Sequence, residues 1–183
     1  KHQKLYKEAA QAFSCAPSIA KAHDERGSIL AEQFQDYQAA LLEFEDALNI
    51  KPDLSNAMVN IAWYTLEAGH QEDEYIKRAL RYAKRAVKID KDSRSAWHRR
   101  SVLGRVYLAT GKLIDAKREL KKSIQSNKKA SQSYFFLAKV HLELGELIQA
   151  KNALAEFLNR PGKSPWYKRS REIAIPLIKD VSY

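Results

Sequence analysis

The chain repeats itself with a period of about 34 residues, and this period constrains its fold more than any other feature. When residues 103–120 are aligned with residues 137–154, nine of the eighteen positions are identical. A period of this length is typical of a helix, a tight turn and a second helix that packs antiparallel on the first. The pattern therefore predicts an all-α array of helical hairpins without a β-sheet.

The residue types at the repeating positions agree with this prediction. Gly111 and Gly145 stand where a first helix must end, because glycine readily adopts the left-handed conformation found at helix C-termini. Ala116 and Ala150 fall on the second helix, where a small side chain allows two helices to approach closely. With Gly69 placed at the same point of an earlier repeat, the sequence predicts turns at all three glycines.

This unit resembles the tetratricopeptide repeat, whose pattern is Leu, Gly, Tyr, Gly, Ala, Phe, Ala and Pro over about 34 residues. The clearest copy carries Leu103, Gly104, Tyr107, Gly111, Ala116 and Leu120, and the next carries Leu137, Ala138, His141, Gly145, Ala150, Leu154 and Phe157. The resemblance implies a right-handed superhelical solenoid of antiparallel helix pairs. It also implies a concave groove, lined by the first helices, that binds an extended peptide or a partner helix.

The repeat phase predicts one array over residues 1–164, followed by a capping helix and tail at 165–183. The array consists of a half repeat at 1–20 and repeats at about 21–54, 55–93, 94–130 and 131–164. The second full repeat fits only with about five extra residues in its turn around His70 to Glu74, and the helix starting near Arg94 is about one turn longer than usual. Ser164 is the expected N-cap of the capping helix, and Pro176 is expected to kink or end it.

The resemblance also indicates which side chains of the first helices face the groove. These candidate partner-binding residues are Asn56, Asn60, Trp63, His98, Arg105, Gln132, Phe135 and Lys139. Trp63, Arg105 and Phe135 are the expected anchors, because aromatic and arginine side chains supply much of the binding energy at protein interfaces. Large rings at helical spacing are also common in cores, so packing against a neighbouring helix is the alternative for Trp63 and Phe135. The partner expected from the cations and rings is a protein or peptide with acidic and apolar residues.

One subgroup of the family grips the terminal carboxylate of chaperones with Lys and Asn on a first helix. The corresponding residues here are Glu25 and Ile29, and a glutamate would repel that carboxylate. Binding of a chaperone tail is therefore not expected.

The residue types that carry catalysis form no recognisable pattern, so the chain is expected not to be an enzyme and to need no cofactor or metal. The five histidines match no metal-ligand spacing, and the single cysteine, Cys15, excludes an intramolecular disulfide. A lone thiol fits a reducing compartment, for which the cytoplasm is the expectation. No apolar run is long enough to cross a bilayer, so insertion into a membrane is not expected.

Charge is distributed unevenly along the chain, which has a formal net charge of +10. Residues 22–76 carry 12 acidic and 2 basic side chains, whereas residues 77–129 carry 18 basic and 4 acidic ones. The basic segment leaves single-stranded RNA binding open as an alternative. A third possibility is a regulatory or sensory segment of a larger protein, since the chain starts in the middle of a repeat.

Overall fold

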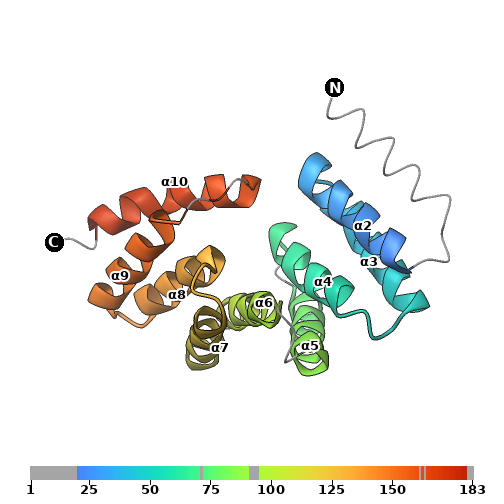
Figure 1. Ribbon diagram of the computed structural model, residues 1–183, viewed down its shortest axis with the longest axis horizontal. Coiled ribbons are helices and arrows are strands. Elements are labelled where there is room, and N and C mark those ends of the chain that lie inside the picture. Colours follow the sequence, from blue (N-terminus) through green and yellow to red (C-terminus); the bar gives the residue numbers. More distant parts are fainter. Residues whose placement is uncertain (1–19, 71, 91–94, 161, 163, 181–183) are drawn as a thin grey trace. The chain divides into compact units, whose positions relative to one another are not determined.

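The computed structural model describes residues 20–70, 72–90, 95–160, 162 and 164–180, and all regular structure in these residues is helical (Figure 1). The half repeat expected at 1–20 lies outside the described residues except for Ala20. The helices are α2 (Ala20–Ile29), the π-helix η1 (Leu30–Phe34), α3 (Tyr37–Ile50), α4 (Ser55–Glu67), α5 (Asp73–Ile89), α6 (Ala96–Ala109), α7 (Leu113–Ser126), α8 (Ser131–Glu143), α9 (Leu147–Leu158) and α10 (Pro165–Asp180).

The chain divides into two compact units, Lys1–Lys91 and Asp92–Tyr183. In the first unit, α2 packs on α3, α3 on α4 and α4 on α5. In the second unit, α6 packs on α7, α7 on α8 and α8 on α9, while α10 covers α9 and α8. Each helix therefore packs on the one that follows it in its unit, as the repeat period predicts. We call α2, α4, α6 and α8 the first helices and their partners α3, α5, α7 and α9 the second helices.

Small side chains let the paired helices approach closely. Ala116 and Ala150, which the period placed in the helix interface, are both fully buried. A Cβ atom on Gly104 would stand 2.5 Å from Leu120 Cγ, so α6 and α7 meet at a distance that only glycine allows at this position. Phe44 and Phe157 fill the cores of the two units and are also fully buried.

The three glycine turns are confirmed. Gly69, Gly111 and Gly145 have φ angles of 75°, 68° and 71°, in the left-handed region that favours glycine. After Gly111, the backbone N–H of Lys112 donates to the carbonyl of Tyr107 at 2.9 Å, which closes the end of α6. The same bond recurs one repeat later, so the two turns are copies of one motif.

The first described hairpin departs from this motif, because its first helix holds one extra residue. Gln35 takes the left-handed conformation there, with a φ of 56°, and the closing bond from Asp36 N–H to the Leu30 carbonyl spans six residues instead of five. The extra residue is absorbed by the π-helical turn η1. Upstream of η1, Gly27 packs on Phe44 in the same way as Gly104 packs on Leu120. Gly27 lies eight residues before the turn residue Gln35, whereas Gly104 lies seven residues before Gly111.

The sequence predicted that all the extra residues of the second full repeat lie in its turn, but only some of them do. From the turn glycine to the first interface alanine there are ten residues in this hairpin, Gly69 to Ala79, against five from Gly111 to Ala116. Helix α5 begins at Asp73, so three of the five extra residues extend the helix and two lengthen the turn. Asp73 and Glu74 in its first turn favour this extension because they complement the helix dipole.

Helix α6, the next first helix, is lengthened by less than the predicted turn. Helix α6 has 14 residues, one more than α4 or α8, and begins at Ala96. Arg94, where the helix was expected to start, lies outside the described residues.

The C-terminal helix begins as predicted, but Pro176 does not end it. The backbone N–H of Tyr167 donates to Ser164 Oγ at 3.2 Å, which makes Ser164 the N-cap. Helix α10 continues through Pro176 to Asp180. Both Pro176 and Glu172, whose carbonyl the proline leaves without its helical donor, are exposed, so water can satisfy that carbonyl.

Candidate partner-binding surface

The predicted residues of α4 differ widely in how much of their side chains reaches solvent. Asn56 is exposed, Asn60 is half-buried and Trp63 is only 8% exposed. Asn60 Nδ2 donates to Asp24 Oδ1 at 2.8 Å, so this side chain ties α4 to α2. The buried ring of Trp63 supports the helix packing of the first unit.

The extra residue in the first hairpin changes which side chains of α2 stand beside α4. Asp24 and Ser28, rather than Glu25 and Ile29, meet Asn60. Burial raises the pKa of Asp24, and the hydrogen bond from Asn60 only partly offsets this rise. The residue of α2 that corresponds to the lysine of the chaperone-binding subgroup is therefore Asp24 and not Glu25. Aspartate is also acidic, so the expectation that a chaperone tail does not bind is unchanged.

In the second unit, Phe135 lies in an aromatic cluster instead of facing solvent. It is 3% exposed, and its ring centroid lies 5.1 Å from that of Phe157 and 5.6 Å from that of Trp166. Arg105 lies over the ring of Phe136, with its guanidinium carbon 5.3 Å from the centroid. Lys139 is exposed. Of these predicted residues, Phe135 joins α8 to α9 and α10, and Lys139 offers a charge to solvent.

His98 and Gln132, predicted from equivalent positions of successive first helices, meet in one pocket. The pocket has a volume of about 240 Å³ and lies within the second unit. It is lined by Trp97, His98, Lys129, Ser131, Gln132, Gly162, Ser164, Trp166 and Tyr167. Residues at equivalent repeat positions thus line one pocket at the start of α6, α8 and α10.

The surroundings of the histidine in this pocket favour its neutral form. Burial lowers the pKa of His98 because the charged imidazolium loses its hydration, and the nearby charge of Arg99 acts in the same direction. The side chain of Gln132 interacts with the imidazole and partly offsets the decrease. Lys129 therefore carries the positive charge of the pocket at neutral pH.

The wall of the pocket that contains Trp97 is held by hydrogen bonds from α7. Ser123 Oγ donates to the carbonyl of Trp97 at 2.6 Å and pairs with Ser133 Oγ of α8 at 2.8 Å. Ser123 and Ser133 are fully buried, so water does not compete for these bonds. They fix the first turn of α6 against α7 and α8.

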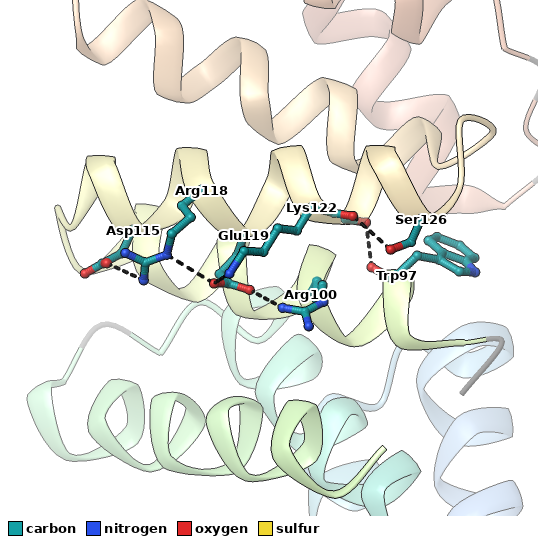
Figure 2. Close-up of polar contacts among 8 residues, drawn as sticks. Trp97, Arg100, Asp115, Arg118, Glu119, Lys122 and Ser126 are labelled. Atoms are coloured by element: carbon teal, nitrogen blue, oxygen red, sulfur yellow. Dashed lines mark hydrogen bonds and ion pairs between the residues drawn. The ribbon is translucent and has the colours of Figure 1, made fainter. Parts of the chain in front are cut away.

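A buried carboxylate further along α7 locks the same helix pair (Figure 2). Glu119 is 6% exposed, and its Oε2 accepts from Arg100 of α6 at 2.8 Å. Its Oε1 lies 3.3 Å from Arg118 Nε and 3.5 Å from Lys122 Nζ. Part of the positive charge of the basic segment is therefore used inside the fold.

Comparison with solved structures agrees with the architecture of paired helices. The chain superposes on Pseudomonas aeruginosa pilF with a TM-score of 0.70 at 17% identity, covering 98% of this chain and 81% of that one. It superposes on TTC0263, a thermophilic tetratricopeptide-repeat protein of Thermus thermophilus, with a TM-score of 0.71 at 18% identity, covering 93% and 91%. The chain has the tetratricopeptide-repeat fold. No family model matches its sequence, and neither does any curated protein.

A third tetratricopeptide-repeat protein is relevant because its site is described. YrrB, a protein of this fold with an unusual peptide-binding site, gives a TM-score of 0.62 at 17% identity. The superposition covers 94% of this chain and 93% of YrrB.

Trp166 is a pocket residue that the sequence prediction did not include. It lies one repeat period after Gln132, which itself lies one repeat period after His98. In the tetratricopeptide phase, α10 therefore starts as a further first helix, although the sequence predicted only a cap. The sequence signal that could have identified Trp166 was the continuation of the 34-residue period beyond Gln132.

The cations of α5 lie on a second helix of the tetratricopeptide array, and several are paired. Arg78 NH1 lies 2.6 Å from Glu45, Lys77 Nζ 3.5 Å from Asp73 and Arg81 NH2 3.7 Å from Glu74. Lys84 and Lys88 are exposed. Of these three pairs, only that of Arg78 with Glu45 is half-buried, so it is the one that clearly ties a cation of α5 into the fold.

Among the described residues, one group has the composition of a metal site. His23, Glu43 and Asp46 have potential ligand atoms within 4.8 Å of one another. Glu43 already pairs with His23 at 2.9 Å and also with Arg26, whose positive charge disfavours a bound cation. The group is better explained as a buried ion pair between α2 and α3. No helix in the described parts of the chain has the length and apolar character needed to cross a membrane.

Proposed function

We propose that the chain is a non-catalytic protein-interaction module that binds a peptide or helix of a partner protein along its first helices. The observation that carries this proposal is the pocket at the start of α6, α8 and α10. Two residues predicted to contact a partner, His98 and Gln132, line it together with the aromatic side chains of Trp97 and Trp166. The peptide-binding site of YrrB gives a precedent for this activity on the same fold.

The other candidate residues divide by their exposure into contact and support roles. Asn56 and Lys139 are exposed and would touch a partner directly. Trp63 and Phe135 are buried and would hold the first helices in place, while Asn60 and Arg105 combine an intramolecular contact with partial exposure. A partner with apolar and acidic residues fits the rings and cations of the second unit.

Selection from a random peptide library on the purified chain tests the proposal before the natural partner is identified. We expect enriched peptides, whose affinities are then measured by fluorescence anisotropy. The first-helix variant Gln132→Ala with Lys139→Glu should weaken binding at least ~10-fold, about 1.4 kcal/mol. The matched second-helix variant, Lys84→Glu with Lys88→Glu, should change it less than ~2-fold, because both lysines are exposed on α5.

Circular dichroism of the two variants shows whether a loss of binding comes from a loss of structure. The proposal fails if no peptide is enriched over an empty support. It also fails if the chain binds single-stranded RNA with a steep salt dependence and only the α5 variant loses that binding.

A further inference from the structure

The size of the pocket at the start of α6, α8 and α10 limits what can occupy it. An apolar cavity of about 150 Å³ holds benzene, whereas drug-sized ligands need roughly 300–1,000 Å³. The volume here, about 240 Å³, lies between these values. The pocket is therefore suited to one large side chain and is small for a nucleotide or an organic cofactor.

The walls of the pocket favour a flat ring. Trp97, Trp166 and Tyr167 supply aromatic surfaces from two different helices. Aromatic rings pair at offset or edge-to-face angles, worth about 0.5–1.5 kcal/mol beyond the burial of their area. Trp166 is itself held by Phe135 and Phe136, whose ring centroids are each 5.6 Å away, so this wall is preorganised.

The charge around the opening favours an acidic neighbour for that ring. Lys129 lines the pocket and is exposed, and no Asp or Glu occurs among the described lining residues. Helices α6, α8 and α10 also begin at the pocket, so the positive ends of three helix dipoles add to the charge of Lys129.

Gln132 supplies a polar group for the backbone of a bound peptide. Its Oε1 atom is buried, and its side chain already interacts with the imidazole of His98. An amide oxygen can accept two hydrogen bonds, so the backbone N–H of a peptide can donate to it in addition to the imidazole. The pocket can therefore hold a peptide by its ring, its main chain and its charge.

We propose that this pocket binds one aromatic side chain of a partner peptide that carries acidic residues on both sides of the ring, with α10 forming part of the binding site through Trp166. The proposal rests on the proposed function and specifies the chemistry of the partner. It makes the C-terminal helix a binding element as well as a cap.

The test uses the capped peptide acetyl-Glu-Asp-Phe-Glu-Asp-amide and the ¹H–¹⁵N spectrum of the chain. The three tryptophans, Trp63, Trp97 and Trp166, each give one indole N–H signal. We expect the signals of Trp97 and Trp166 to shift on titration, while that of Trp63 in the first unit stays in place. Replacing the phenylalanine of the peptide with alanine, or its acidic residues with lysine, should remove the shifts.

A pair of neighbouring lysines provides a matched control in the chain. Lys129→Glu should weaken binding of the acidic peptide about 10-fold, whereas Lys128→Glu should change it less than about 2-fold. Both side chains are exposed, so neither change should affect folding, but only Lys129 lines the pocket. Equal effects of the two substitutions, or equal binding of the lysine-flanked peptide, would overturn the proposal.

Peptides selected from the random library separate this proposal from the proposed function. If they bind tightly but leave the Trp97 and Trp166 signals unchanged, the pocket is not the anchor although the module binds peptides. If no library peptide binds, the proposed function itself fails.

Discussion

Gln35 adopts the left-handed backbone conformation, with a φ of 56°, at the position that Gly69 occupies one repeat later with a φ of 75°. The turn between the first and second helix requires this conformation whichever residue is present. For a residue with a Cβ atom it costs roughly 1–2 kcal/mol. The first hairpin therefore contains backbone strain that is absent from the turns with glycine at this position.

Replacing Gln35 with glycine should relieve this strain. We expect Gln35→Gly to raise the free energy of unfolding by about 1 kcal/mol, measured by urea denaturation. Gln35 is exposed, so the substitution removes little packing. An unchanged or lower stability would mean that the left-handed conformation is not what limits this turn.

The opposite substitution at Gly111 isolates the backbone contribution. A Cβ atom at Gly111 would meet no atom within 4 Å, so Gly111→Ala creates no steric clash. We expect it to lower the free energy of unfolding by about 1 kcal/mol, because alanine resists a φ of 68°. A neutral result in the same urea assay would contradict this reading of the turns.

The buried carboxylate of Glu119 should stabilise the α6 and α7 pair. Glu119→Gln removes the charge that faces Arg100 and keeps the shape, and we expect a loss of about 1–3 kcal/mol by urea denaturation. Asp115→Asn is the control, because Asp115 is 38% exposed at its side chain and pairs with the half-exposed Arg118. Its effect should stay below ~1 kcal/mol. Similar losses for both variants would argue against a special role of the buried group.

The lowered pKa of His98 predicts how stability changes with pH. An unfolded histidine titrates near 6.5, and burial in the folded chain lowers the pKa of His98 below this value. As the pH falls below about 6.5, the unfolded chain binds a proton at this site that the folded chain does not, so His98 contributes a loss of stability. The loss is absent well above pH 6.5.

His98→Asn tests this contribution, because the variant differs from the wild type only in lacking this imidazole. We expect the variant to lose less stability than the wild type between about pH 7.5 and pH 5.5, measured by urea denaturation at both pH values. Parallel pH profiles for the two proteins would show that His98 does not titrate below its unfolded value.

The regular parts of the fold were predictable because glycine and alanine act through local rules. Gly69, Gly111 and Gly145 indicated turns with a left-handed residue, and Ala116 and Ala150 indicated close contacts between helices. Gln35 gives no such signal, and a single inserted residue in a weakly matching helix cannot be distinguished from a change of register. The π-helical turn η1, and with it the contacts of Asp24, therefore required the structure.

The candidate site was predictable only in part, because a repeat phase assigns side chains to faces but not to depths. It placed His98 and Gln132 on equivalent positions, and the structure brings them to one pocket. It could not show that Phe135 is covered by Trp166, because that contact depends on how α10 packs on α8 and α9. Trp166 was missed because α10 was predicted only as a cap.

Intermolecular nuclear Overhauser effects between the chain and an acidic aromatic peptide selected from the library show whether the pocket holds the ring of the peptide. We expect contacts from the ring protons of the peptide to the indole of Trp166 and the imidazole of His98. Contacts confined to the second helices, such as α5 or α7, with none to Trp166 or His98, would contradict this expectation.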